Sequence, residues 1–301
     1  MEFLYLLEKI RVPILNKIML AITLLGEETA FLAVGLIVFW CVGKRQGYYL
    51  MSVGLAGTAA SQLLKIICRV PRPWVRDSSF MILEEAKVAA AGYSFPSGHT
   101  QTAVGTFGSV AAFTRKKWLA AICIVLAALV GFSRMYIGVH TPADVLAGAL
   151  ISVILIAVFH VLVSGKRDKT YIMLLILTTV SIAYWLYMKY TVFPEDIDLH
   201  NYESAIKNAY TLLGCSLALL VVYPVEKRYI CFSVKASWWG QIIKVLLGLL
   251  AVLAVKEGLR APLELIFNDQ LIARAVRYFL IVITAGIVWP MTFRFFEKTG
   301  K

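Results

Sequence analysis

The 301-residue sequence is poor in charged side chains. Asp, Glu, Lys and Arg make up 16% of it, hydrophobic residues make up 60%, and the mean hydropathy is +0.77. Soluble domains carry about a quarter charged residues. These proportions therefore exclude an ordinary soluble domain and indicate a chain solvated by lipid. The length does not require two domains, because a polytopic membrane protein can form one continuous helical bundle.

Cysteine is scarce as well, and its pattern excludes two kinds of site. The cysteines number five and no CxxC pair occurs, so the sequence supports neither a disulfide framework nor a zinc site. Internal repeats and low-complexity segments are also missing. We expect no cleavable signal peptide, because charged residues between positions 2 and 11 interrupt the N-terminal apolar stretch.

Acidic residues are outnumbered by basic ones, 18 to 30, which gives a formal net charge of +12. A basic balance can indicate nucleic-acid binding. In a membrane chain the ordinary explanation is that cytoplasmic loops are rich in Lys and Arg. We therefore expect the lipid bilayer as a partner and no nucleic acid, and the sequence leaves a homo-oligomer open.

Long apolar runs predict an all-α, polytopic membrane helical bundle with about nine transmembrane helices. A span needs about 20 apolar residues to cross a hydrocarbon core of about 30 Å. Residues 1–27 are predicted to be an N-terminal interfacial amphipathic segment, because Lys9, Arg11 and Lys17 suit a helix lying in the interface. A core over 28–165 and additional helices of unknown role over 166–301 follow. The predicted spans are 28–43, 47–67, 98–114, 118–138, 142–163, 171–190, 206–223, 241–257 and 275–293.

The short loops predict the orientation. Four basic loops, 43–47, 114–118, 165–169 and 225–229, are expected in the cytoplasm. The acidic segment 192–203 and the connections 69–98 and 135–141 then fall on the extracytoplasmic side. The predicted location is the cell membrane, or the endoplasmic reticulum membrane with a lumenal site if the protein is eukaryotic.

Three polar clusters interrupt the apolar pattern on that outer side: "KIICRVPRPW", "PSGH" and "SRMYIGVHTPAD". Each has an ordinary structural explanation when taken alone. Lys65 and Arg72 could extend to lipid headgroups from the end of a span. Ser97 could simply cap a helix, and Pro142 with Asp144 could begin another. Their convergence on one face favours a shared function.

The clusters together supply a site for phosphate. Lys65, Arg72 and Arg134 carry positive charge and donors suited to phosphate oxygens. Ser97 and the backbone N–H groups that begin at Gly98 predict an anion site at a helix N-terminus. This combination predicts a phosphate-binding cradle.

Two of the four histidines, His99 and His140, lie beside these donors in the sequence. Asp144 follows His140 by four residues, a spacing that could hold one ring nitrogen and leave the other free to attack. A histidine-based active site for phosphate chemistry is therefore the economical interpretation.

These residues resemble the signature of a known family. Lys65-x6-Arg72-Pro73, Pro96-Ser97-Gly98-His99 and Ser133-Arg134-x5-His140-x3-Asp144 are similar to the three-part motif of type 2 phosphatidic acid phosphatases. That superfamily includes lipid phosphate phosphatases, glucose-6-phosphatase and vanadium haloperoxidases. The resemblance covers roughly residues 20–165, and nothing familiar is identified in residues 170–301.

The resemblance implies a role for each motif residue. His140 would be the nucleophile that forms a phosphohistidine, Asp144 would orient it, and His99 would protonate the leaving alkoxide. The phosphate oxygens would be held by Lys65, Arg72, Ser97, Gly98 and Arg134. Neither a metal nor a cofactor is expected, because Lys and Arg neutralise the phosphate charge.

The implied activity is hydrolysis of a lipid phosphate monoester or diphosphate, of the phosphatidic acid, phosphatidylglycerol phosphate, polyprenyl diphosphate or sphingoid phosphate type. Three alternatives stay open: a lipid phosphotransferase, a vanadate-dependent haloperoxidase, and a non-catalytic lipid-phosphate binding or transport protein. The sequence does not choose the substrate.

Several other polar residues are expected to be structural. His160 is interpreted as a packed helix histidine, and His200 and the Glu84–Glu85 pair as solvated. Trp238 and Trp239 are interpreted as an interfacial belt. Four basic residues flank the last outer loop against the positive-inside trend, and we expect them to reach the interface, with contact to a second phosphate or headgroup as the alternative. They are Lys256, Arg260, Arg274 and Arg277.

Overall fold

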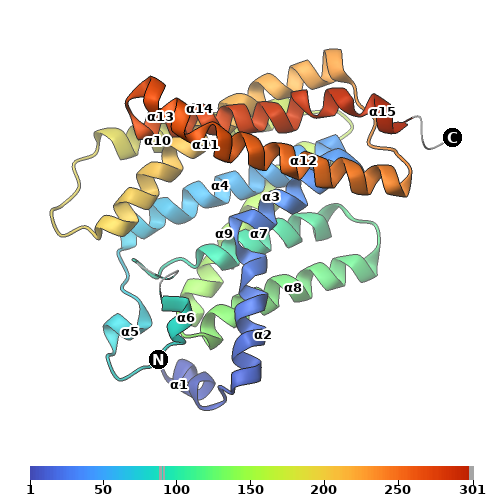
Figure 1. Cartoon of the computed structure of the whole chain (residues 1–301). Coiled ribbons are helices and arrows are strands. Elements are labelled where there is room, and N and C mark those ends of the chain that lie inside the picture. The colour runs from blue at the N-terminus through green and yellow to red at the C-terminus, as the bar shows by residue number, and fades with distance from the viewer. Residues whose placement is uncertain (88–89, 91, 298–301) are drawn as a thin grey trace. The chain divides into compact units, whose positions relative to one another are not determined.

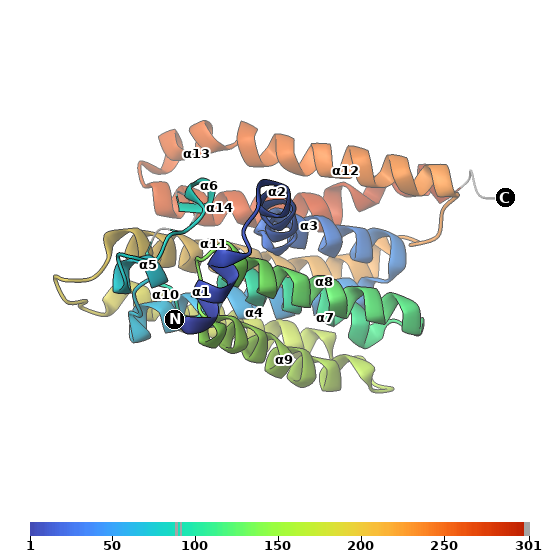
Figure 2. The same ribbon diagram turned by 90° about the horizontal axis from the view of Figure 1, so that it is seen from below.

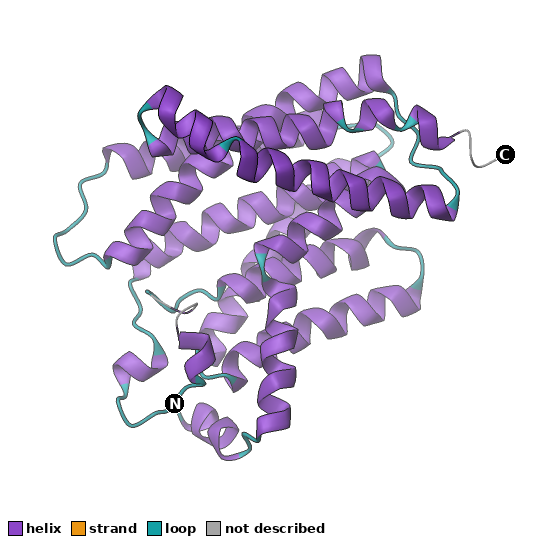
Figure 3. Cartoon of the chain, in the orientation of Figure 1, coloured by secondary structure: helices purple, strands orange, loops and turns teal. Residues whose placement is uncertain are grey.

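A computed structural model describes residues 1–87, 90 and 92–297 of the chain. Every regular element among these residues is helical (Figure 3), which confirms the all-α fold class. Residues 88, 89 and 91 of the predicted outer connection, and 298–301 of the C-terminal part, lie outside the described residues. The α-helices are α1 (Glu2–Lys9), α2 (Pro13–Thr23), α3 (Glu28–Ile37), α4 (Lys44–Cys68), α5 (Pro73–Arg76), α6 (Glu84–Lys87), α7 (Gly98–Phe113), α8 (Lys117–Tyr136), α9 (Pro142–Ser164), α10 (Thr170–Tyr190), α11 (Leu199–Val225), α12 (Trp238–Gly258), α13 (Arg260–Phe267), α14 (Gln270–Ile283) and α15 (Arg294–Glu297).

Local sequence explains where many of these helices begin. Helices α2, α5 and α9 each start with a proline, whose missing N–H costs nothing in the first turn. Ser97 caps α7, because its hydroxyl oxygen accepts from the backbone N–H of Thr100 at 3.4 Å. Asp269 caps α14 by accepting from the N–H groups of Leu271 and Ile272.

Six segments among the described residues are long and apolar enough to cross a membrane, which makes the chain a multi-pass membrane protein. Each of them matches a predicted span in position. Their bounds are Lys44–Arg76, Lys117–Tyr136, Pro142–Ser164, Thr170–Tyr190, Leu199–Ile230 and Gln270–Phe296.

The predicted count of nine spans is not confirmed. The predicted spans 98–114 and 241–257 are not among the six segments. Helix α7 has 16 residues, and at 1.5 Å per residue it is about 24 Å long, which is shorter than a typical hydrocarbon core. The predicted span 28–43 occurs only as the second half of a bent pair, Pro13–Gly26 with Glu28–Val42, which is bent by 55°.

The N-terminal interfacial helix is not confirmed either. Residues 3–24 are divided between α1 and α2, and α2 belongs to that bent pair. The pair would add a seventh crossing if it were a single span.

The chain forms two compact units, and the first contains residues 1–32, 53–160 and 191–205. In this unit α7 and α8 form an antiparallel hairpin whose helices lie side by side (Figures 1 and 2). Their contact buries Ala103 and Phe107 of α7 against Ala127 and Val130 of α8. This packing fixes the two helix ends that carry the motif residues.

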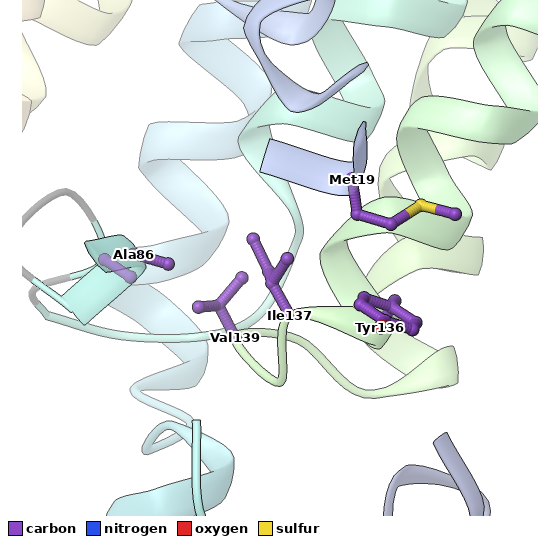
Figure 4. Close-up of a cluster of buried hydrophobic side chains, with 6 residues drawn as sticks. Met19, Ala86, Tyr136, Ile137 and Val139 are labelled. Carbon is purple, nitrogen blue, oxygen red and sulfur yellow. The ribbon is translucent and has the colours of Figure 1, made fainter. Parts of the chain in front are cut away.

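A second apolar cluster of this unit lies under the connection between α8 and α9. Figure 4 shows Ile137 and Val139 of that connection beside Met19 of α2 and Ala86 of α6. Both connection residues are fully buried. The backbone that leads to His140 is therefore held by core packing.

The second unit contains residues 33–52, 161–190 and 206–301. Its core includes Trp40, which is fully buried and donates its Nε1–H to the carbonyl of Ala285 at 2.9 Å. Helices α11 and α14 approach closely at Gly214, where a Cβ would lie only 2.1 Å from the carbonyl oxygen of Ala275. The absent side chain of glycine allows this approach. Lys44 and Glu226 form an ion pair in the same unit.

Candidate active site

The first unit contains a cavity of about 400 Å³, a size typical of small-molecule sites. All three sequence clusters contribute to its wall. The structure therefore brings together residues separated by as many as 75 positions. Six of the eight residues named from the sequence line the cavity: Lys65, Arg72, Gly98, His99, Arg134 and His140. The other two, Ser97 and Asp144, are buried and do not line it.

Three basic side chains of the cavity are withdrawn from solvent. Lys65, Arg72 and Arg134 have exposed fractions of 8%, 6% and 4%. Lys65 donates to the carbonyl of Tyr93 at 2.7 Å, and Arg134 donates to the hydroxyl of Thr23 at 2.7 Å. Among the described residues neither forms an ion pair. Buried charges are costly unless they are paired, so this arrangement favours an anionic ligand.

Arg134 also has donor capacity left over. Its Nε is buried and has no hydrogen-bond partner among the described residues. An unsatisfied buried donor carries a desolvation cost. A phosphate oxygen in the cavity would remove that cost.

Arg72 contacts the ring of His140 directly. Its Nη1 lies 3.0 Å from His140 Nε2 and donates to the carbonyl of Val139 at 2.9 Å, while its Nε donates to the carbonyl of Gly92. A guanidinium has donors only, so Nε2 is the acceptor in this contact. The proton of the neutral ring is therefore assigned to Nδ1.

The opposite nitrogen of His140 faces Asp144, as the sequence predicts, but Ser94 lies between them. The Nδ1 atom is 3.6 Å from Asp144 Oδ2 and 3.4 Å from Ser94 Oγ. The Ser94 hydroxyl donates to Asp144 Oδ2 at 2.6 Å. Ser94 Oγ can therefore accept a hydrogen bond from His140 Nδ1–H while its own hydroxyl donates to the carboxylate.

Asp144 also begins helix α9. Its Oδ2 accepts from the backbone N–H of Thr141 at 2.7 Å, and the Thr141 hydroxyl oxygen accepts from the N–H of Asp144 at 3.3 Å. This reciprocal pattern is a capping box. Asp144 can therefore cap the start of α9 and also face His140.

Burial of His140 has a direct electrostatic consequence. Its exposed fraction is 2%, and it lies in the connection between two candidate spans. Burial first, and then the positive charges of Arg72, Arg134 and Lys65, lower the pKa of His140 well below its usual value. The ring is therefore neutral near pH 7 and keeps a lone pair on Nε2.

Close backbone packing positions the first turn of α7. The backbone of Ser97 is held in place, because its N–H donates to the carbonyl of Asp144 at 2.9 Å. A Cβ on Gly26 would lie 2.8 Å from the carbonyl oxygen of His99, so only glycine allows this approach. By contrast, a Cβ on Gly98 would meet nothing within 4 Å. Gly98 therefore leaves open space at the cavity wall.

His99 differs from His140 in its surroundings. It lines the cavity, and its imidazole ring makes no hydrogen bond to another side chain or backbone group among the described residues. Its ring is therefore available to a ligand, as a proton donor to a leaving group would need to be. Its role stays a prediction.

The sequence reasoning missed several residues of the site. One of them is Ser94, two positions before Pro96. It lies in a loop whose conformation is set by tertiary contacts, such as the hydrogen bond from the Ser94 N–H to the carbonyl of Val70. A readable signal existed in α4, where Thr58, Ser61, Gln62 and Lys65 repeat at helical spacing and all line the cavity. This stripe of polar residues on an otherwise apolar helix indicates the side of α4 that faces the cavity.

His200 was interpreted as solvated, and it is exposed, but it also lines the cavity. Its neighbours Asn201 and Ser204 do the same. His160 is not among the lining residues. Across the described part of the chain, no three His, Cys, Asp or Glu side chains gather into a group that could hold a metal ion.

Comparison with known proteins gives matches to both halves of the chain. The profile of the PAP2 superfamily matches residues 45–168, and the profile described as PAP2 superfamily phosphatase, transmembrane extension, matches residues 210–301. The first match covers all eight site residues named above. The second covers much of the region in which the sequence analysis identified nothing.

Curated relatives match about half of the chain. Undecaprenyl-diphosphatase BcrC of Bacillus subtilis is 31% identical over 148 residues, which cover 47% of this chain and 72% of the relative. Phosphatidylglycerophosphatase B of the same organism is 31% identical over 173 residues, covering 53% and 79%. An undecaprenyl-diphosphatase of Sulfolobus acidocaldarius is 28% identical over 151 residues, covering 50% and 71%. No solved structure matches the chain significantly.

Proposed function

This chain belongs to the PAP2 superfamily and is a membrane-integral lipid phosphatase, and from this premise we propose that it hydrolyses a lipid phosphate monoester or diphosphate through a phosphohistidine on His140. One observation carries the proposal. A neutral, buried His140 presents Nε2 to Arg72, in a cavity that also holds Lys65 and Arg134. The named relatives act on undecaprenyl diphosphate and phosphatidylglycerophosphate, which gives the two substrate types to test first.

The first step forms a bond between His140 Nε2 and phosphorus. The substrate phosphate takes over the Arg72 donor that now contacts Nε2, and this exchange frees the lone pair. Lys65 and Arg134 hold the remaining oxygens and stabilise the charge of the transition state. The bound phosphate neutralises the cations around His99, so that its ring can hold a proton. As the P–O bond to the lipid breaks, His99 donates that proton to the leaving oxygen.

The second step releases phosphate. Water attacks phosphorus, His99 accepts a proton from that water, and the P–N bond returns its electron pair to His140 Nε2. Through Ser94, Asp144 stabilises the positive ring that exists while the phosphoryl group is attached. Ser97 and Gly98 contribute the cap and the open backbone at the start of α7.

We propose that no divalent metal is needed, because three buried cations supply the charge that a metal would supply. Chelator-treated enzyme is expected to keep its activity, and restoration only by magnesium would contradict this part. Vanadate is expected to inhibit competitively, since its five-coordinate form resembles the phosphoryl group in transfer. The Arg134→Ala variant should then bind vanadate less tightly.

We propose that the site opens on the extracytoplasmic side. Helix α7 begins, and α8 ends, at the site, while the basic segment 114–118 joins their other ends. The basic loop 165–169 likewise follows the far end of α9. Basic loops favour the cytoplasm. Cysteine labelling at position 85 in a cysteine-free background should succeed without permeabilisation, whereas labelling only after permeabilisation would invert the topology.

The finer architecture is part of the proposal. Helices α3, α7 and α12 would complete nine crossings, and residues 1–27 would lie in the interface. The phosphatase core would then occupy 28–165 and the added helices 166–301.

The decisive experiment measures phosphate release in detergent from a panel of lipid phosphates. Wild-type protein should release phosphate from at least one of them, and the His140→Ala variant should release none. His160→Ala is the matched control, because it removes a histidine that does not line the cavity. Rapid quenching under alkaline conditions should trap a phosphoenzyme in wild-type protein only.

Two results would favour other functions. Transfer of phosphate to an acceptor lipid, with little free phosphate, would indicate a phosphotransferase. Binding of lipid phosphates with no turnover of any substrate would indicate a binding or transport protein.

A further inference from the structure

The second unit contains its own charged cavity, of about 470 Å³, formed by α11, α12, α13 and α14. None of its residues belongs to the phosphatase site. Its charged side chains are mainly basic, and they come from all four helices. The basic ones are Lys207, Lys256, Arg260, Arg274 and Arg277.

Acidic residues offset only part of this charge. Glu257 lies 3.7 Å from Lys256, and Glu264 lies 3.5 Å from Arg260. Five basic against two acidic side chains leave an excess of three positive charges in the lining. Such an excess at one concave surface attracts an anion.

Two arginines on one face of α14, Arg274 and Arg277, line this cavity. Arg277 is 9% exposed, and its Nε has no hydrogen-bond partner among the described residues. Arg274 is held in place by Thr211 of α11, whose hydroxyl oxygen accepts from Arg274 Nε at 2.7 Å. Both lie in a segment apolar enough to span a membrane. Ionised residues in such segments are expensive and usually functional.

The rim of the cavity is suited to lipid. Helix α13 directs Arg260 and Glu264 to the cavity, whereas Leu265 and Ile266 on the same helix are 83% and 72% exposed. A short helix with a charged side and an exposed apolar side is typical of the membrane interface. The headgroup of a lipid bound here would contact the arginines of the cavity, and its acyl chains would contact Leu265 and Ile266.

We propose that this cavity binds the phosphate headgroup of an anionic phospholipid, with Arg274 and Arg277 as its main donors. Guanidinium groups suit phosphate oxygens because they donate two parallel hydrogen bonds. Free phosphate has the same oxygens but no acyl chains to place against Leu265 and Ile266. The lipid is therefore a resident ligand of the C-terminal extension, separate from the substrate.

The test titrates purified full-length protein in detergent with phosphatidylglycerol, and separately with phosphatidylcholine and with inorganic phosphate. Native mass spectrometry counts the bound lipids, and thermal unfolding reports stabilisation. Wild-type protein should retain phosphatidylglycerol in preference to phosphatidylcholine. The Arg274→Gln variant should bind it about tenfold more weakly or worse, because hydrogen bonds to charged groups are strong.

Two controls separate this cavity from other effects. Arg228→Gln removes one exposed positive charge elsewhere in the same unit and should leave phosphatidylglycerol binding unchanged. Arg134→Gln weakens the phosphatase site and should also leave it unchanged. If Arg277→Gln does not fold, Arg274→Gln alone decides the outcome, because its side chain is only partly buried.

Three results would overturn the proposal. Equal retention of phosphatidylcholine would contradict recognition of an anion. Stabilisation by inorganic phosphate that matches phosphatidylglycerol, with no retained lipid, would make the ligand free phosphate. Unchanged phosphatidylglycerol binding in Arg274→Gln would show that the lipid binds elsewhere.

Discussion

The backbone of Ser97 and the α-carbon of Gly148 are in close contact: a Cβ on Gly148 would lie 2.5 Å from the carbonyl oxygen of Ser97. This contact joins the first turn of α7 to α9, one turn beyond Asp144. The same two helices are also connected by the hydrogen bond from the N–H of Ser97 to the carbonyl of Asp144. The cap of the anion-binding turn and the partner of His140 are therefore held in one rigid arrangement.

Gly148→Ala is expected to be destabilising and to lower activity. Because the atom that the methyl group would meet belongs to the backbone of Ser97, the helices must separate to admit it, and such overpacking typically costs about 1–3 kcal/mol. A lower thermal unfolding midpoint and a lower kcat on a lipid phosphate should appear together. A fully stable and active variant would show that the two helices are not tightly coupled.

Gly98→Ala is the contrasting case. A Cβ at this position meets nothing within 4 Å of protein, and alanine favours a helical conformation. We expect the unfolding midpoint to be unchanged or raised. Because the methyl group would point into the phosphate space, kcat/KM should fall. Unchanged kcat/KM would mean that the phosphate does not approach this turn.

Ser94→Ala tests the bridge between Asp144 and His140. The variant leaves the Thr141 capping contact in place but removes the hydroxyl that donates to the carboxylate at 2.6 Å. A hydrogen bond to a charged group is worth about 1.5–3 kcal/mol, so kcat should fall by about 10- to 100-fold with little change in KM. Thr106→Ala, which removes a hydroxyl farther along α7, is the control. Equal effects of both variants on kcat would contradict a positioning role.

Much of the site could be predicted from the sequence, because its residues stand at helix ends. Arg72 follows α4, Ser97 precedes α7, and Arg134 and His140 flank the end of α8. Alternating apolar runs bring such ends to one face of a bundle. Spacing and chemistry then suffice to propose a shared phosphate site.

The contacts within the site could not be predicted in the same way. The position of Ser94 depends on the path of the 92–97 segment, where its N–H donates to the carbonyl of Val70. The contact of Arg72 with His140 Nε2 joins residues 68 positions apart. The span count could not be predicted because the length and bending of a helix depend on tertiary structure: α7 ends after 16 residues, and residues 13–42 form a helix pair bent by 55°.

Protonation of His140 should affect stability in acid. Its pKa is lowered in the folded protein, so below the unfolded value of about 6.5 the unfolded chain binds a proton that the native site does not. The stabilisation is therefore complete above about pH 6.5 and is lost as the pH falls below it, by up to about 1.4 kcal/mol per pH unit. Unfolding midpoints of wild-type protein should fall between pH 6.5 and 5 more steeply than those of His140→Gln. Parallel curves would contradict a neutral buried ring.

The two histidines should respond differently to the leaving group. If His99 only donates a proton, its loss should matter most for a basic leaving group, such as a lipid alkoxide. General acid catalysis is worth about 10²- to 10⁴-fold, so His99→Ala should lose that much on a lipid phosphate monoester and far less on p-nitrophenyl phosphate. His140→Ala should be inactive on both substrates, because no phosphoenzyme can form. If His140→Ala kept aryl phosphatase activity while His99→Ala was inert on both substrates, the nucleophile and the acid would have been assigned in the wrong order.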